Sequence, residues 1–400
     1  MNSVGALSHD EPVSERVSFK QWLAVIAVAV GTFLVVTAEQ LPVGLLTSVG
    51  DDLGISEGTA GLMLTVPGLI ASFSALLVPV AIGRLDRRTV LLGLITLMVV
   101  ANLLSFLASG FPLLLAARFL AGISIGGFWA LAAGIAVRLV PGAHVARATS
   151  IAFGGATAAN VLGVPAGTLI GELTNWRIAF LTLAGLGLLA VVALFPLLPT
   201  MPATESLRLG ALFALFADRV VRAAIITTFL LVGGHMAAYT FVSPILQDIS
   251  GIDDGLIGPM LLGFGAAGVI GTFIAGGAAA RNVRATVIAG GVLLTAVLAL
   301  FPLIGGTLAT GLILLILWGL AFGGVPVGVQ MLIFKAAPDR AEAATALNTV
   351  VFNLAIALGA LLGGLIVDAA STTVALWLAA VLTALTVVSV SSASRAIVRS

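Results

Sequence analysis

Residues 22–46, WLAVIAVAVGTFLVVTAEQLPVGLL, decide the fold of this chain. An α-helix needs roughly 20 apolar residues to cross the hydrocarbon core of a bilayer, and this stretch is longer and carries one charge, Glu39. It has no small-residue cleavage site and is too long for the apolar part of a signal peptide. We therefore expect it to remain in the protein as the first membrane-spanning helix.

The composition of the whole chain agrees with a membrane protein. Of its 400 residues, 60% are hydrophobic and 9% are charged, whereas a soluble domain has roughly 45–50% apolar and about 25% charged residues. The chain has no cysteine, which excludes disulfides, Cys-ligated zinc and thiol nucleophiles. Its three histidines lie far apart, so we expect no metal site. The net charge of +1 offers no basic surface for nucleic acid.

Eleven more apolar runs follow the first. They are long and unbroken, which favours helices over the alternating strands of a barrel. The breaks fall at charges, proline and glycine, and the first break is expected at Asp51 and Asp52. The predicted spans are residues 22–46, 59–82, 89–109, 112–138, 147–171, 176–198, 221–246, 256–280, 285–304, 309–335, 342–367 and 372–392.

The basic residues are distributed unevenly across these loops. When alternate loops are assigned to the two sides, one side holds almost all of them, while Arg177 lies on the other side and Arg118 lies within a span. The positive-inside rule makes the basic side cytoplasmic and places both termini there. The residues on that side are Arg16, Lys20, Arg84, Arg87, Arg88, Arg138, Arg147, Arg208, Arg219, Arg222, Arg281, Arg284, Lys335, Arg340, Arg395 and Arg399.

A polar interval divides the chain into two halves that resemble each other. A shift of 197 residues places Gly122 and Gly126 on Gly319 and Gly323, and a shift of 196 residues places Gly163 on Gly359. Two parallel six-helix repeats are typical of one large class of transporters. We expect cytoplasmic segments at 1–21, 199–220 and 393–400, and six-helix bundles at 22–198 and 221–392.

Several motifs resemble those of the major facilitator superfamily, in its twelve-helix drug/proton antiporter branch. The chain is similar to bacterial efflux permeases for sugars, purine nucleosides and chloramphenicol. The resemblance implies an all-helical fold of two six-helix pseudo-repeats that alternates access between the two sides. Its motifs are Thr37-Ala-Glu-Gln-Leu-Pro-Val-Gly-Leu-Leu46, Asp52-Leu-Gly-Ile-Ser56, Arg118-Phe-Leu-Ala-Gly122, Gly163-Val-Pro165-Ala-Gly167, Asn175-Trp-Arg-Ile-Ala-Phe180 and Ala238-Tyr-Thr-Phe-Val-Ser-Pro244.

Two of these motifs carry further implications. The antiporter motif around Gly163, Pro165 and Gly167 implies a smooth packing face on the fifth helix. The loop after the second helix, which in the family reads G-x-x-x-D-R-x-G-R-R, departs from that pattern at residues 79–88. Either a glycine replaces the family aspartate, or one residue is missing and Asp86 is that aspartate. A charge relay that latches conformations is implied, and the alternative is an anchor of positive charge. The gating-loop residues are Gly83, Arg84, Asp86, Arg87 and Arg88.

Only Glu39 and Arg118 are charged and lie deep within predicted spans. Such groups in hydrocarbon are costly and are functional candidates. Each lies about seven residues from the outer end of its predicted helix. At 1.5 Å per residue, both are therefore about 10 Å below the outer surface of the membrane. We expect Glu39 to carry a coupling proton, with Arg118 favouring its charged form. Two alternatives stay open: a permanent ion pair, and direct contact of Glu39 with the solute.

The candidate solute-binding residues are polar side chains near mid-membrane. We expect Asn160, His235 and Asn353 at the middle, with Trp129 and Gln330 nearer the cytoplasm. Tyr239 lies one turn from His235 on the same helix face, and we favour this pair for solute contact. For each residue the alternative is a hydrogen bond between helices. His235 is also a rival proton carrier.

No ATP-binding motif G-x-x-x-x-G-K-[ST] occurs, so a gradient must supply the energy, and no cofactor is expected. We interpret the chain as a proton-coupled exporter of a small organic solute, monomeric in the lipid bilayer of a bacterial inner membrane. The alternative is an uncoupled or proton-symport importer. The sequence does not favour a channel, because it has no loop that resembles a selectivity filter. It does not favour an enzyme, because no nucleophile is paired with a base.

Overall fold

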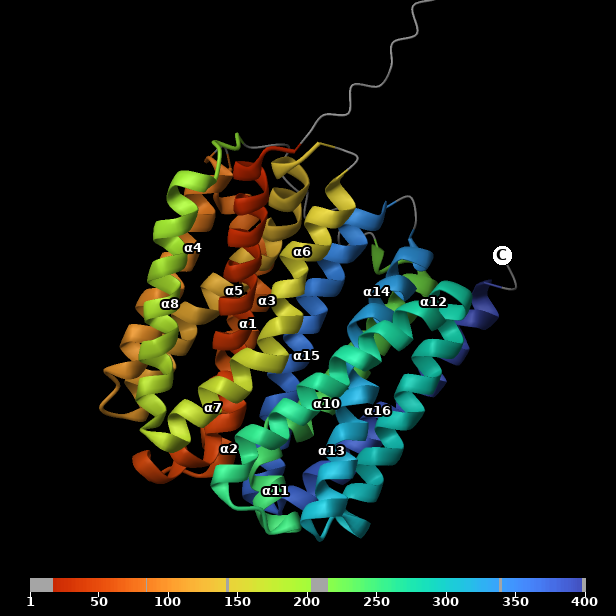
Figure 1. The fold of residues 1–400 in the computed structure, drawn as a ribbon. Helices are drawn as coiled ribbons and strands as arrows, with labels where there is room; N and C mark the ends of the chain where they lie inside the picture. The colour runs from red at the N-terminus through yellow and green to blue at the C-terminus, as the bar shows by residue number, and fades with distance from the viewer. Residues whose placement is uncertain (1–16, 84, 142–143, 203–214, 338–339, 398–400) are drawn as a thin grey trace, which may run out of the picture.

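The computed structural model describes residues 17–83, 85–141, 144–202, 215–337 and 340–397, and these residues form helices and short connections without strands (Figure 1). Arg84, most of the predicted tails and most of the central loop lie outside the described residues. The helical elements are α1 (Phe19–Leu53), α2 (Glu57–Ala60), α3 (Leu62–Ala81), α4 (Arg87–Phe106), α5 (Phe111–Leu139), α6 (Val145–Ala158), η2 (Ala159–Gly163), α7 (Val164–Leu173), α8 (Trp176–Leu197), α10 (Arg219–Tyr239), α11 (Val242–Ser250), α12 (Asp254–Ile304), α13 (Leu308–Gly323), α14 (Val325–Ala336), α15 (Ala341–Ala369) and α16 (Thr372–Ile397).

Within the described residues, eleven helical segments are long and apolar enough to cross a membrane. One of them, α12, has 51 residues. At 1.5 Å per residue it is about 76 Å long, more than twice the thickness of a hydrocarbon core of about 30 Å. Its backbone leaves the helical region at Asn282, where φ is −152° and ψ is 92°. The two arms of α12 therefore make two crossings, as predicted, and the described residues account for twelve.

The first helix is longer than predicted. The expected break at Asp51 and Asp52 is wrong, because α1 continues through both residues to Leu53. Gly54 then stops the helix in the left-handed region, at φ 63° and ψ 40°. Charged side chains at an exposed helix end do not break the backbone, whereas a residue in the left-handed conformation does. Glu39 consequently lies near the middle of α1 and not near its end.

Three predicted spans are interrupted in the middle. A π-helical turn, η2, separates α6 from α7, and short non-helical breaks separate α10 from α11 and α13 from α14. Each interruption lies just before or beside a proline: Pro165, Pro244 and Pro326. Proline has no backbone N–H to donate to the carbonyl four residues earlier, so the helix deforms there. π-Helical turns inside helices are frequent at functional sites.

The helix pairs of the two halves pack through equivalent glycines. Glycines of α5 face carbonyl groups of α3, and glycines of α13 face carbonyl groups of α12; the shift of 197 residues holds for both partners of each contact. Glycines after α6 face α1, and glycines of α15 face α10, with a shift of 196 residues. The pairs are Gly122–Pro67, Gly126–Ala71, Gly319–Phe264, Gly323–Gly268, Gly163–Thr37, Gly167–Leu41, Gly359–Gly233 and Gly363–Ala237.

These approaches are too close for a side chain. A Cβ atom added at Gly126 would lie 2.2 Å from the Ala71 carbonyl oxygen, and one added at Gly323 would lie 2.0 Å from that of Gly268. In lipid, helices gain no hydrophobic drive to associate, so close van der Waals contact supplies the attraction. The repeat in the sequence is thus a repeat of backbone contacts.

The two halves meet at the end of the molecule that holds α2, which we name the α2 end. In Figure 1 α2, α7 and α11 come together at the bottom, opposite the start of α1. There Asp368 of α15 accepts hydrogen bonds from Ser56 Oγ at 2.6 Å and from Gly58 N at 2.9 Å. Ser243 Oγ donates to the Val43 carbonyl oxygen at 3.1 Å. Contacts between the halves therefore close the α2 end.

Candidate functional site

Arg118 lies at the centre of the first half, in α5, and is fully buried. Its Nε donates to the Met63 carbonyl oxygen at 3.2 Å, and its Nη2 donates to the Ala38 carbonyl oxygen at 2.8 Å. The guanidinium therefore joins α5 to α3 and α1, beside the peptide bond that precedes Glu39. This contact agrees with the predicted match in depth between Arg118 and Glu39. Arg118 Nη1 is buried and has no partner among the described residues.

Glu39 does not form an ion pair with Arg118 in this structure. Among the described residues the one salt bridge joins Arg177 to Asp52. Glu39 is 7% exposed, and its neighbours Thr37 and Gln40 each hold a buried side-chain oxygen without a partner in the described part of the chain. Buried polar atoms are usually hydrogen-bonded, so unpartnered ones mark a place where a ligand or water completes the bonding. The sequence left open a permanent ion pair between Glu39 and Arg118. This conformation does not contain that pair.

His235 lies at the centre of the second half, at the position of α10 that corresponds to Glu39 under the shift of 196 residues. It is fully buried among aromatic rings. The ring centroids of Tyr239 and Phe322 lie 4.8 Å and 3.3 Å from that of the imidazole, both in stacked geometry. Trp318 Nε1 donates to His235 Nδ1 at 2.9 Å. His235 Nε2 has no partner among the described residues.

Phe264 of α12 extends the same group. Its ring stacks on Tyr239 at 4.7 Å between centroids. We name His235, Tyr239, Phe264, Trp318 and Phe322 the aromatic cluster. The spacing of four residues predicts the contact between His235 and Tyr239, and the other three members are new. Trp318 lies one residue before Gly319, which packs against Phe264, so the repeat of glycines was the signal that could have located them.

The other predicted solute-binding residues lie apart from the aromatic cluster. Gln330 Nε2 donates to Thr345 Oγ1 at 3.0 Å, and Asn348 Nδ2 donates to Gln330 Oε1 at 3.3 Å. Asn353 Nδ2 donates to the carbonyl oxygen of Thr349 in its own helix at 2.9 Å. The Gln330 contacts match the alternative of a hydrogen bond between helices, whereas the Asn353 bond lies within one helix.

Trp129 and Asn160 belong to the first half. The Trp129 ring packs against Phe128 and Phe153, at 6.2 Å and 5.7 Å between centroids. Asn160 lies in the π-helical turn, and its carbonyl oxygen approaches Gly265 of α12 so closely that an added Cβ would be 2.4 Å away. Asn160 therefore marks a contact between the two halves, at the residue next in sequence to Phe264 of the aromatic cluster, and Asn160 itself is exposed.

The altered loop binds the segment that follows α8. Gly83 adopts φ +45°, a conformation that favours glycine. Asp86 caps α4 and accepts from Arg88 N at 2.8 Å and from Met201 N at 3.0 Å. An Arg88 side-chain nitrogen donates to the Phe195 carbonyl oxygen. Asp86 thus bonds to backbone amides; Arg84 lies outside the described residues, so a relay through it stays a prediction.

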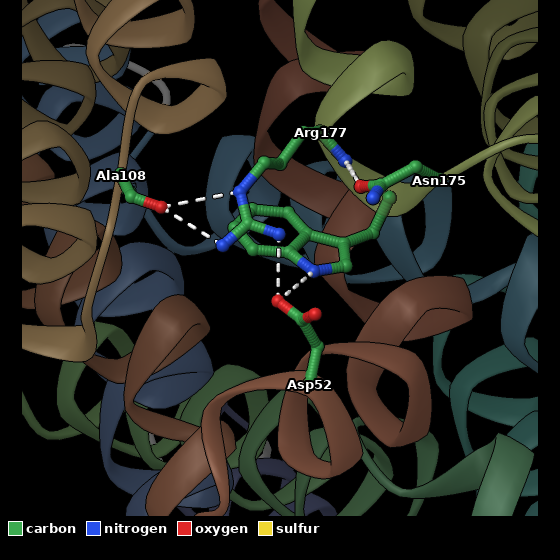
Figure 2. A network of polar contacts seen from close by, with 5 residues as sticks. Asp52, Ala108, Asn175 and Arg177 are labelled. Atoms are coloured by element: carbon green, nitrogen blue, oxygen red, sulfur yellow. Dashed lines mark hydrogen bonds and ion pairs between the residues drawn. The ribbon is translucent and has the colours of Figure 1, made fainter.

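One polar network ties helix ends together at the α2 end of the first half (Figure 2). Arg177 Nη1 contacts Asp52 Oδ2 at 2.6 Å, and its Nε and Nη2 donate to the Ala108 carbonyl oxygen at 3.2 Å and 3.0 Å. Trp176 Nε1 also donates to Asp52 Oδ2, at 3.1 Å. The network fixes the start of α8 to the end of α1. The signal for it in the sequence was Arg177, the single basic residue of that side.

The structure thus has two glycine-packed helical bundles, with buried Glu39 on the first helix of one and buried His235 on the first helix of the other. A sequence model described as Major Facilitator Superfamily matches residues 28–359. The chain belongs to this superfamily. It is therefore a multi-pass membrane transporter and not an enzyme, as predicted. No group of three or more His, Cys, Asp or Glu residues that could hold a metal occurs in the described residues.

Named relatives refine the comparison. The chain is 36% identical over 357 residues to the purine ribonucleoside efflux pump NepI of Salmonella paratyphi B, which covers 89% of each chain. The NepI proteins of Salmonella enteritidis and Salmonella gallinarum match to the same extent.

Solved structures of the superfamily share the fold. A bacterial homologue of the human lysosomal transporter Spinster, inward-facing and occupied, has a TM-score of 0.76 and 13% identity over 94% of this chain and 98% of that one. The human organic anion transporter MFSD10 has a TM-score of 0.69 and 19% identity over 92% of this chain and 99% of that one. The predicted fold of this major facilitator chain is thereby confirmed.

Proposed function

We propose that the protein exports purine nucleosides, or closely related planar solutes, in exchange for protons. The observation that carries the proposal is the aromatic cluster around His235, in a chain that resembles purine ribonucleoside efflux pumps over most of its length. A purine has a flat π face that stacks on aromatic rings and a polar edge that forms hydrogen bonds. The unpartnered His235 Nε2 supplies one such bond beside the rings. Sugars such as arabinose lack the flat face that this cluster favours.

Proton coupling is assigned to Glu39. Its carboxyl group lies in a buried region beside the backbone that Arg118 binds, with no ion pair to hold it in the charged form. Movement of α5 against α1 brings the guanidinium nearer to the carboxylate or takes it away. Approach favours the charged carboxylate and retreat favours the protonated acid, so one conformational cycle carries one proton. Thr37 and Gln40, whose buried side-chain oxygens have no partner among the described residues, are the groups we assign to bind the ribose hydroxyls.

Alternating access is assigned to the two bundles, at residues 22–198 and 221–392. The hydrogen bonds of Asp368 with Ser56 and Gly58 support a conformation closed at the α2 end. We assign the α2 end to the outer face and both termini to the cytoplasm, which the distribution of basic residues supports. We assign the protein to a bacterial inner membrane, as a monomer in the lipid bilayer that uses the proton gradient and no cofactor.

Counterflow in proteoliposomes tests the proposed solute. Purified protein is reconstituted with unlabelled inosine inside, and entry of labelled inosine is measured while other solutes compete from outside. We expect purine nucleosides to compete, with arabinose and chloramphenicol ineffective at the same concentrations. Saturable competition by arabinose or chloramphenicol alone would assign the protein to another solute class. A pH gradient that is acidic inside the vesicles should drive uphill uptake of inosine, because protons leave as the solute enters. Flux that ignores the gradient would favour the uncoupled alternative.

A further inference from the structure

A cavity of about 200 Å³ lies within the second half; its lining includes Leu231, one turn before His235, but no member of the aromatic cluster. It is bounded by both arms of α12 and by α13 and α14, close to the bend at Asn282. The lining is built mainly from small or aliphatic residues, among them Gly271, Ala275, Gly290, Val325 and Gly328. Because these side chains are small, they leave a space between the helices.

The first half fills the corresponding space. Under the shift of 197 residues, Val325 corresponds to Phe128 and Gly328 corresponds to Leu131. Phe128 is 0% exposed and Leu131 is 7% exposed. The repeat would place two large side chains here, and the second half has replaced them with valine and glycine. The residues that line the cavity therefore differ in size from their counterparts in the first half, although both halves share their helix packing.

The chemistry of the lining suits an apolar ligand. The one lining residue with a polar side chain is Thr286, and its hydroxyl already donates to the Asn282 carbonyl oxygen at 2.9 Å. No free polar group of the lining remains to orient a nucleoside. Ile274, which lines the cavity, is 60% exposed, and its neighbour Phe273 is 76% exposed. Large exposed apolar side chains on a membrane-spanning helix face lipid, so the cavity opens toward the bilayer.

Two basic residues lie beside the cavity at the bend of α12. Arg281 follows the lining residue Ala278 by three positions, and Arg284 precedes the lining residue Val287 by three positions. Both arginines are exposed, and neither has a hydrogen bond or ion pair within the described residues. Arginine is well suited to bind phosphate because its guanidinium offers paired donors. An apolar space with unpaired arginines at its margin is complementary to an acyl chain joined to a phosphate.

We propose that this cavity binds one anionic phospholipid of the membrane leaflet on the Arg281 side. The acyl chain occupies the cavity between α12, α13 and α14, and Arg281 and Arg284 bind the phosphate. The occupant is a lipid and not the transported solute, because the lining offers no free polar group and opens to the bilayer. A lipid seated here holds the two arms of α12 at the bend, and the first of these arms contributes Phe264 to the aromatic cluster.

Native mass spectrometry of the intact protein tests the site. The protein is released from nanodiscs of mixed phosphatidylglycerol and phosphatidylcholine, and retained lipid is counted. We expect one phosphatidylglycerol per chain. The Gly290→Leu/Val325→Phe variant should lose it, because the larger side chains occupy the cavity; the nearest atom to a Cβ at Gly290 is 3.9 Å away, so the change fits the backbone. The Arg281→Gln/Arg284→Gln variant should weaken retention about fivefold for each arginine.

Matched variants separate the site from general effects. Gly185→Leu adds the same side chain where no atom lies within 4 Å, in the first half, and Arg219→Gln/Arg222→Gln removes two exposed arginines elsewhere on the same side of the protein. Both should retain the lipid. Thermal unfolding of each variant confirms its fold. Retention of phosphatidylglycerol by the cavity-filled variant at the level of the natural sequence would overturn the proposal, as would equal loss in the Arg219/Arg222 variant. Displacement of the lipid by glycerol 3-phosphate without tails would equally contradict the role of the cavity.

Discussion

The two halves of the molecule have the same helix contacts and different interiors. Gly163 faces Thr37 in the first half as Gly359 faces Gly233 in the second, with one shift for both partners. On the same shift, Glu39 corresponds to His235. The first half surrounds its titratable group with a buried guanidinium and unpartnered oxygens, and the second surrounds it with aromatic rings. The repeat thus supplies the helix packing, while the residues that depart from it are the ones to which we assign the chemistry.

The largest expected effect concerns the charge in the first half. Glu39→Gln should abolish uphill transport driven by a pH gradient, because the amide cannot take up a proton, and should leave solute exchange at equal pH intact. Proteoliposome uptake with and without a gradient measures both. Glu172→Gln, at the α2 end, is the matched control and should retain coupling. Uphill transport by the Glu39→Gln variant would contradict the assignment of proton coupling to Glu39.

The next effect tests whether the two halves pack equivalently. Gly163→Val and Gly359→Val should each cost about 1–3 kcal/mol of stability, as overpacked cores do. The second should cost more, because its added Cβ would lie 2.4 Å from the Gly233 carbonyl oxygen of the backbone, whereas that at Gly163 would meet the Thr37 side chain. Thermal unfolding in detergent measures the difference. Gly185→Val, with no atom within 4 Å, is the control; an equal loss there would mean that glycine contacts are not what stabilises the bundles.

A smaller effect concerns the aromatic cluster in the second half. His235→Gln should raise the KM for inosine about tenfold, or about 1.4 kcal/mol, because stacked ring pairs contribute about 0.5–1.5 kcal/mol each. Coupling to the pH gradient should persist. His144→Gln, which alters a histidine near Trp22 outside the cluster, should leave KM unchanged. An unchanged KM in the His235 variant would place the solute elsewhere.

The smallest effect concerns the ion pair of the polar network at the start of α8. The second half keeps one bond at the equivalent place, from Thr372 Oγ1 to Asp248 Oδ2 at 3.2 Å, but has Thr373 where α8 has Arg177. Asp52→Asn should lower stability by less than about 1 kcal/mol, because the side chains of Arg177 and Asp52 are 23% and 43% exposed and water screens the pair. Unfolding at low and high salt measures this. A loss of several kcal/mol would show that the network holds the bundle together.

Much of the fold can be predicted from the sequence, because the long apolar runs, the charges in the loops and the internal repeat each predict the same membrane spans. The helix ends and interruptions did not follow, since Gly54 and not Asp51 or Asp52 stops α1, and since the π-helical turn before Pro165 depends on how the backbone adapts to a missing donor. Periodicity predicts neighbours on one helix, such as His235 and Tyr239.

Contacts across helices are harder to predict. Nothing in the sequence pairs Trp318 with His235, and the proximity of Arg118 to Ala38 was predicted only as a match in depth. The sequence also suggested that polar residues at mid-membrane form one site. In the structure Gln330 bonds to side chains of α15, and Asn160 contacts Gly265 through its backbone carbonyl; both contacts depend on how the helices pack, which the sequence does not give.

The affinity for inosine, measured as a function of pH in the purified protein and two variants, tests the central division most directly. The account predicts that affinity of the natural sequence falls as pH is lowered, by up to about tenfold per pH unit for one linked proton. Glu39→Gln should bind with an affinity that no longer depends on pH, and His235→Gln should bind more weakly at every pH with the dependence retained. Loss of the pH dependence in the His235 variant, with its persistence in the Glu39 variant, would contradict the account and make His235 the proton carrier.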